Sequence, residues 1–251
     1  MDEALTPQKG ASFVRECMVF NGRDRHIEAP LSGHELGGDA GLTVMARVRR
    51  SASGADWDRL IDFGNGEEKE NIVLNFQQEM MYEVRGPDGQ NQVLAVGSSR
   101  TGAAGDGDDG SKITTFPENE WIHVSLVHDA DGTASIFWNG RCKASGKVWL
   151  PQRVPREKYY VGRSHWQHDP YFHGCISDVH IFDYALSLAD VLKCAYSRTF
   201  PTGTCRCPEI RGRSKAQTSV LNERVGDDHC PTGALHCTVS LPSPATVPFN
   251  I

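Results

Sequence analysis

The chain has 251 residues, 39% of them hydrophobic, and a formal net charge of −6. This length suits one large all-β domain, or one domain with an appendage. The negative charge argues against nucleic-acid binding, which needs Lys and Arg concentrated on one surface. No apolar stretch approaches the ~20 residues of a membrane helix, so no membrane span is predicted.

Signals for the cellular location point in two directions. The first residues, Met1-Asp2-Glu3-Ala4, lack a basic stretch followed by an apolar one, so no secretory signal is visible. Eight cysteines favour an oxidising compartment, whereas no Asn-x-Ser/Thr site for N-glycosylation occurs. We expect an extracellular or cell-surface location only if the sequence is part of a longer secreted chain.

Short β-prone runs separated by Gly, Asp, Asn and Pro occupy residues 13–184, which is typical of a sandwich or barrel. In the clearest run, apolar Ile122, Val124 and Leu126 alternate with polar side chains, so one face can be buried. The turns at Asp131-Gly132 and Asn139-Gly140 predict a three-stranded meander from residue 121 onward. Further strands are predicted at 13–20, 42–50, 59–63, 71–76, 80–85, 92–96, 159–162 and 175–182.

The C-terminal third contains the single predicted helix and a change in composition. Ser187 is a suitable N-cap with Asp190 three residues later, which predicts a helix over 187–196. Six of the 13 prolines and four of the eight cysteines follow residue 197. We therefore predict a sandwich over 13–197 and an irregular Cys/Pro-rich tail over 198–251. The Gly/Asp-rich stretch 102–110 is predicted to be a loop.

Residues 160–187 contain the pattern G-R-S-x-W-x-x-D-P-Y-F-x-G-x-I-S-D-V-x-I-F-x-x-A-L-S. This pattern closely resembles the closing strands of laminin-G-like jelly-roll domains. Residues 19–22, 59–66, 71–74 and the 121–140 hairpin agree with the same family in the right order. The resemblance covers residues 13–197 and implies an all-β, two-sheet antiparallel jelly-roll sandwich of the concanavalin A-like kind. It also implies a recognition module, since similar domains bind glycans or proteins.

Enzymatic activity is not expected, because the Glu-x-Asp-x-x-Glu motif of the endoglucanases in this superfamily is absent. The acidic cluster at 67–70 follows Gly64-Asn65-Gly66 and more simply forms a solvated turn. A divergent glycoside hydrolase is the weakest of the functional alternatives. The others are a module that binds carbohydrate through loops or the concave sheet, and a protein-interaction or scaffolding domain at a cell surface or outside the cell.

A glycan site needs aromatic faces and a few fixed polar groups. One loop carries the candidate residues: Trp166, His168, Asp169 and Tyr171. In similar domains these positions belong to the conserved frame, so they could instead pack the loop onto the sandwich. Trp57, Trp138 and Trp149 are open to both readings, and Trp138, at a hairpin end, is a candidate core residue.

Two further sites depend on the resemblance. If the first and last strands pair, as they do in similar sandwiches, Asp178 would approach Asn21 and Asp24 and could hold a structural calcium ion; a hydrogen-bonded turn is the alternative. Cys175 and Cys194 match positions at which laminin-G-type domains close a disulfide. His165, His168 and His173 crowd one loop and could bind a transition metal, although exposed loop histidines usually do not.

Overall fold

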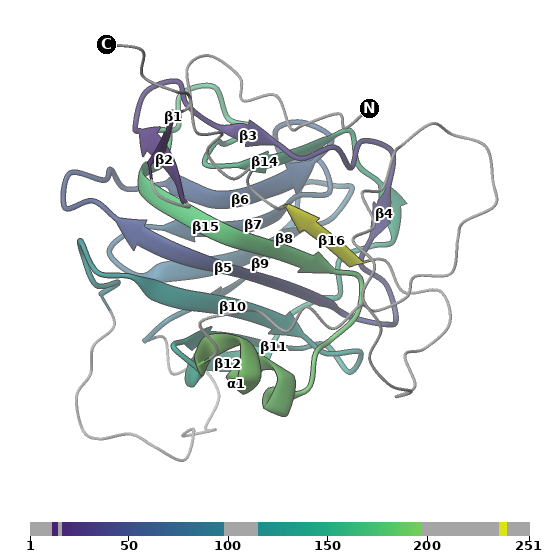
Figure 1. Ribbon diagram of the computed structural model, residues 1–251. Helices are drawn as coiled ribbons and strands as arrows, with labels where there is room; N and C mark the ends of the chain where they lie inside the picture. The colour runs from purple at the N-terminus through teal and green to yellow at the C-terminus, as the bar shows by residue number, and fades with distance from the viewer. Residues whose placement is uncertain (1–11, 15–16, 98–114, 197–235, 240–251) are drawn as a thin grey trace, which may run out of the picture.

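Figure 1 shows the computed structural model, which describes residues 12–14, 17–97, 115–196 and 236–239. Two large antiparallel sheets are stacked face to face. Seven strands of the eight-stranded sheet follow one another in space: β1 (Ser12–Val14), β2 (Cys17–Asn21), β15 (His173–Phe182), β5 (Leu42–Arg50), β10 (Ile122–His128), β11 (Thr133–Trp138) and β12 (Arg141–Lys147). The eighth strand, β16 (His236–Val239), pairs with β15 outside this order. The six-stranded sheet contains β3 (Ile27–Glu28), β14 (Lys158–Val161), β6 (Asp58–Gly64), β7 (Ile72–Phe76), β8 (Met80–Arg85) and β9 (Asn91–Ala95). A small separate pair consists of β4 (Glu35–Leu36) and β13 (Val154–Pro155).

The hydrophobic core lies between the two large sheets. Val124 and Leu126 are fully buried in it, as the alternation predicted. The polar residues between them, His123 and Ser125, are buried as well, so the other face of this strand is not open to solvent. Phe76 of β7 packs against Phe116 and Phe172, with ring centroids 4.8 and 5.8 Å apart. These aromatic contacts join the six-stranded sheet to the segments that lead into β10 and β15. The fold is therefore the predicted two-sheet sandwich.

The meander and the helix are also as predicted. β10, β11 and β12 pair in sequence order. The helix α1 (Leu188–Tyr196) begins after Ser187, whose hydroxyl oxygen accepts a hydrogen bond from the backbone N–H of Asp190 at 3.3 Å. Val191 of α1 packs with Val127 and Phe137 on the outer side of the eight-stranded sheet (Figure 1). With nine residues, α1 is too short to cross a membrane, and no other described helix could do so.

Three details differ from the sequence prediction. The run predicted as one strand over 13–20 is a hairpin of two paired strands, β1 and β2. The two-residue strands β3, β4 and β13 were not predicted, because runs so short carry no periodicity. Within the tail predicted as irregular, β16 (His236–Val239) pairs antiparallel with β15. Residues 102–110 and the remainder of 198–251 lie outside the described residues, so those predictions are not addressed.

Candidate functional site

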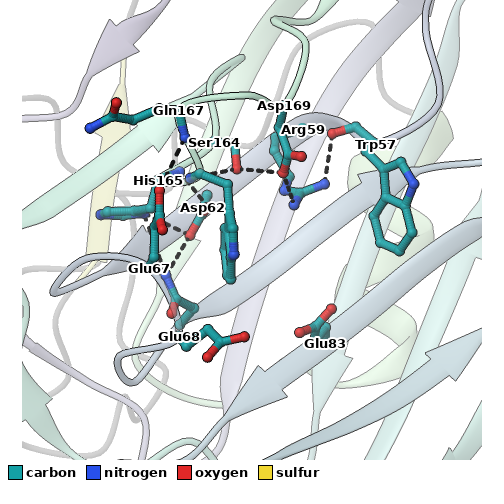
Figure 2. Close-up of polar contacts among 12 residues, drawn as sticks. Trp57, Arg59, Asp62, Glu67, Glu68, Glu83, Ser164, His165, Gln167 and Asp169 are labelled. Atoms are coloured by element: carbon teal, nitrogen blue, oxygen red, sulfur yellow. Dashed lines mark hydrogen bonds and ion pairs between the residues drawn. The ribbon is translucent and has the colours of Figure 1, made fainter. Parts of the chain in front are cut away.

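The loop after β14, residues 163–171, is fastened to the outer face of β6, the face turned away from the core. Asp62 of β6 is fully buried, and its Oδ2 accepts a hydrogen bond from the backbone N–H of His165 at 2.9 Å. The other carboxylate oxygen lies 2.9 Å from His165 Nδ1 and accepts a hydrogen bond from Asn71 at 3.0 Å. Because these bonds are shielded from water, they hold the start of the loop firmly in place (Figure 2).

A second attachment is an ion pair between Arg59 of β6 and Asp169 of the loop. Arg59 Nη2 donates to Asp169 Oδ2 at 2.6 Å, and the Ser164 hydroxyl donates to the same oxygen at 2.9 Å. Arg59 Nη1 donates to the Trp57 carbonyl oxygen, also at 2.6 Å. The guanidinium is thus held on one side by the loop and on the other by the segment before β6, as Figure 2 shows.

Two indole rings flank the Arg59 guanidinium. Its central carbon lies 5.8 Å from the Trp57 ring centroid and 5.6 Å from that of Trp166. Arg85 of β8 approaches the Trp166 ring to 5.0 Å, so this ring lies over the strand between, β7. These distances fall within the range of cation–π attraction. Trp57 is 45% exposed and Trp166 is partly exposed, so both rings can meet a ligand.

The backbone at Trp57 has an unusual conformation, with φ at +72°. Residues other than glycine rarely adopt positive φ, and such strain tends to occur at functional sites. The Trp57 N–H donates to the Phe76 carbonyl oxygen at 2.7 Å, which helps to hold this geometry. The strained conformation therefore keeps an exposed indole at the edge of the outer face.

Asn75 lies beneath these groups on β7, directly opposite Arg59 in the strand register. Its side chain is fully buried, yet neither its amide oxygen nor its amide nitrogen has a hydrogen-bond partner among the described residues. Arg59 Nε is unpartnered as well. Each unsatisfied buried polar group in a native structure needs a physical explanation, and an absent ligand or water is one. We call Trp57, Arg59, Asn75, Arg85 and Trp166 the Trp-Arg surface.

The four predicted glycan-binding residues do not form one cluster. Trp166 belongs to the Trp-Arg surface, and Asp169 supports it through Arg59. Tyr171 instead contacts His26 and Arg163, with centres 5.8 and 5.9 Å away, and His168 is exposed. Sequence reasoning missed Arg59, Asn75 and Arg85. The available signal was the presence of polar residues inside apolar strands. This pattern shows which side chains face away from the core, but it does not show which side chains of other strands lie beside them.

The other tryptophans that were left open differ from each other. Trp138 is a core residue, and its Nε1 donates to the Met80 sulfur at 3.3 Å. Trp149 is 45% exposed, and its backbone N–H donates to Gln92 of β9 at 2.7 Å. Only Trp57, among the three, lies beside the guanidinium of the Trp-Arg surface.

The predicted calcium ligands do not converge. β2 and β15 pair as expected, but Asn21 lies opposite His173, five residues from Asp178, a separation of about 16 Å along the strand. Asn21 Oδ1 accepts hydrogen bonds from backbone N–H groups of its own turn, and its amide donates to Asp24 at 2.8 Å. Asp178 faces Arg47 at 3.6 Å. These side chains make a capped turn and an ion pair, and together they do not fit one calcium site.

The loop histidines also have separate surroundings. His165 faces Asp62, whereas His173 Nδ1 lies 2.9 Å from the Ser53 hydroxyl. In the part of the chain that the structure describes, no three His, Cys, Asp or Glu side chains are grouped as metal ligands.

The acidic cluster at residues 67–70 lies on a turn, as predicted, since Glu67 and Glu68 are exposed between β6 and β7. A pocket of about 490 Å³ lined by residues 38–39 and 150–154 shares no residue with the Trp-Arg surface.

The predicted disulfide between Cys175 and Cys194 is not formed. Both cysteines are free thiols, and Cys194 is buried on α1. The cysteine on the strand beside Cys175 is Cys17 of β2, two residues from Val19, which pairs with Cys175. The prediction relied on an analogy of positions, whereas the strand register brings a different cysteine to Cys175.

Comparisons with known proteins agree with the architecture. Among solved structures, domain 4 of AbnA, an extracellular arabinanase from Geobacillus stearothermophilus in complex with arabinotriose, is similar at 20% identity. The match covers 76% of this chain and 81% of that one, with a TM-score of 0.50. The CBM40 domain of the Ruminococcus gnavus IT-sialidase, bound to α2,3-sialyllactose, is 14% identical. This match covers 74% of this chain and 100% of the CBM40 chain, with a TM-score of 0.51.

No curated protein matches the chain. A family model of the laminin G type, described as the concanavalin A-like lectin/glucanases superfamily, matches residues 21–192. This match spans more than half of the chain and nearly the whole described sandwich, from the end of β2 into α1. The chain therefore belongs to the laminin-G-like group of the concanavalin A-like lectin/glucanase superfamily.

Proposed function

We propose that this protein is a non-catalytic carbohydrate-binding module whose ligand rests on the Trp-Arg surface. The observation that carries the proposal is the pair of accessible indoles, Trp57 and Trp166, on either side of the Arg59 guanidinium. Aromatic faces pack against sugar C–H groups, while neighbouring polar groups select the hydroxyls. Two relatives that share the fold are named as complexes with oligosaccharides, which supports the same class of ligand.

The polar groups of the surface are held before any ligand arrives. Arg59 is bound by Asp169 and by the Trp57 carbonyl, so its remaining donors point in set directions. A prearranged site loses less conformational entropy on binding. The surface is shallow, however, because Val73 and Asn75 beneath it are fully covered, so we expect modest affinity.

Charge pairing favours neutral sugars. Arg59 is neutralised by Asp169, and Arg85 forms ion pairs with Glu83 and Glu68. A sugar carboxylate would have to displace one of these carboxylates or accept repulsion from it, whereas a neutral hydroxyl would not. We therefore propose neutral oligosaccharides over sialylated or uronic-acid-containing ones.

The same pairing supports a binding role over hydrolysis. Glycoside hydrolysis requires one carboxyl group to donate a proton and a second to act as nucleophile or base. Asp169 and Glu83 each form an ion pair with an arginine, so neither carboxylate is free to act on a glycosidic bond. In this proposal, Asp169 and Glu83 position the guanidinium groups of Arg59 and Arg85 at the binding surface.

Binding to a glycan array, followed by calorimetry with arabinotriose and with α2,3-sialyllactose, tests the proposal. We expect binding to neutral oligosaccharides that exceeds binding to the sialylated probe. Trp57→Ala and Trp166→Ala should each weaken the affinity roughly 5- to 30-fold, since each indole contributes about 1–2 kcal/mol. Trp121→Ala is the matched control, because Trp121 is 43% exposed and precedes β10 in the other sheet.

Two results would contradict the proposal. The first is an array on which no glycan binds the folded protein. The second is a glycan whose affinity is unchanged in both Trp57→Ala and Trp166→Ala. Release of reducing sugar by the unaltered chain, abolished in Asp169→Asn, would instead show a hydrolase.

A further inference from the structure

Cys17 and Cys175 occupy neighbouring strands on the outer face of the eight-stranded sheet. The register of β2 and β15 pairs Cys175 with Val19 and Ile176 with Met18. Met18 and Ile176 belong to the core, so Cys175 points outward. Cys17 is two residues from Val19 and therefore lies on the same face, diagonal to Cys175.

The two thiols are close enough to influence each other, since Cys175 is one of the groups that shift the pKa of Cys17. Burial raises the pKa of the Cys17 thiol to about 11, and the adjacent Cys175 contributes to the rise. Cys17 is 8% exposed, whereas Cys175 is more accessible. An external oxidant can therefore reach Cys175 more readily than Cys17.

We propose that Cys17 and Cys175 form a disulfide bond that joins the first long strand of the sandwich to the last. The oxidant is a small-molecule disulfide such as oxidised glutathione. The proposal rests on the strand register and the shared face, and it is independent of the proposed glycan site.

The chemistry proceeds by two thiol–disulfide exchanges. The Cys175 thiolate attacks one sulfur of oxidised glutathione, which forms a mixed disulfide and releases one glutathione thiolate. The Cys17 thiolate then attacks the Cys175 sulfur and releases the second glutathione. The protein loses two electrons and two thiol protons, and the glutathione disulfide is reduced to two thiols. Because the raised pKa leaves little Cys17 thiolate at pH 7, the second step should accelerate as the pH rises toward 9.

The bond would support the base of the 163–171 loop. Phe20 of β2 packs against Phe172, with ring centroids 5.6 Å apart, and closely approaches Gly162. Both ends of the loop therefore pack against Phe20 of β2. A bond from Cys17 to Cys175 encloses almost the whole sandwich in one covalent ring, and long rings restrict the unfolded chain the most.

Peptide mapping tests the pairing directly. Trypsin places Cys17 in residues 16–23, Cys175 in 164–193 and Cys194 in 194–198, so each pairing gives a distinct cross-linked product. The full chain is incubated with a mixture of reduced and oxidised glutathione, and free thiols are then alkylated. We expect residues 16–23 linked to 164–193, with the link lost after dithiothreitol. Alkylation of both cysteines in the native protein, or Cys175 linked to another cysteine, would overturn the proposal.

Thermal unfolding gives a second, independent measurement. The oxidised chain should have a Tm roughly 5–10 °C above that of the reduced chain. Cys17→Ser and Cys175→Ser should each abolish this difference, while Cys194→Ser, which alters a buried thiol elsewhere, should retain it. If Cys17→Ser does not fold, the peptide map of the unaltered chain still decides the pairing. A Tm difference that survives in Cys175→Ser would refute the proposed bond.

Discussion

Arg59 Nη2 on β6 donates to Asp169 Oδ2 on the 163–171 loop at 2.6 Å, across 110 residues of sequence. Arg59 is 5% exposed and Asp169 is 24% exposed, so the contact is largely withdrawn from water. This ion pair holds the loop against the sheet and simultaneously sets the Arg59 guanidinium between two indoles. The order of the loop and the shape of the Trp-Arg surface therefore depend on the same contact.

Replacing Asp169 by Asn tests how much the ion pair with Arg59 stabilises the folded protein. The variant keeps the size of the side chain but leaves the Arg59 charge uncompensated, which should cost about 1–3 kcal/mol of unfolding free energy. Urea denaturation measures this loss. Asp131→Asn, which breaks an exposed pair with Lys147 at 2.8 Å, is the control and should change stability little. Equal losses in the two variants would show that the buried pair has no special role.

Gly162 precedes the loop and has no room for a side chain. Its φ is +77°, and an added Cβ would lie 2.4 Å from a ring carbon of Phe20. Gly162→Ala should therefore destabilise the fold by about 2–4 kcal/mol, through backbone strain and displacement of Phe20. Gly33→Ala has a similar φ of +80° but open space around it, so it should cost only about 1 kcal/mol. Thermal denaturation compares the two, and equal losses would mean that the Phe20 contact is unimportant.

Asp58 should make stability fall as the pH rises from about 4 to about 7. Burial raises the pKa of Asp58 to about 7, although Arg50, whose Nε lies 3.2 Å away, lowers it. Because this pKa is above that of the unfolded chain, the folded state holds the extra proton in this range, and that advantage disappears as the pH increases. Asp58→Asn should remove this slope when unfolding free energies are measured between pH 4.5 and 7.5. Parallel profiles for the two proteins would contradict the assignment.

His123 should make the stability of the fold decrease as the pH falls. Burial, together with the charge of Arg47, lowers the pKa of His123 to about 4. The unfolded chain takes up a proton near pH 6.5 while the folded chain does not, so this contribution to stability is lost as the pH falls from 6.5 to 4. His123→Gln should lessen the acid sensitivity, measured as Tm against pH. A steeper loss of Tm in the variant than in the parent chain would rule this explanation out.

Much of the fold was predictable because its signals are local. Alternation at Ile122, Val124 and Leu126 predicts a strand with one face in the core, and the structure buries all three there, although it also covers the opposite face of β10. Ser187 marks the start of α1 because its hydroxyl can accept a backbone N–H within one turn. Two-residue strands and β16 were missed, since such short pairings depend on a neighbouring strand rather than on their own sequence.

Sites that depend on several segments were predicted poorly. Trp166 was a candidate, but its partners Arg59 and Arg85 come from strands about 100 and 80 residues earlier in the chain. Asn21 and Asp178 were expected together because their strands pair, yet the register places Asn21 at His173. Knowing that two strands pair does not tell which residues lie opposite each other. Each residue of shift in the register moves a side chain by about 3.3 Å along the strand.

By itself, the sequence determined where the strands, the turns and the helix lie and which apolar side chains face the core, and its resemblance to laminin-G-like domains implied the two-sheet sandwich. The local features arise from interactions within a strand, a turn or one helical turn. The tertiary structure decided which outward-facing residues become neighbours: Trp57 and Trp166 around Arg59, and Cys17 beside Cys175. The reason is physical, because such neighbours are set by strand register and loop docking, which the packing of distant segments determines.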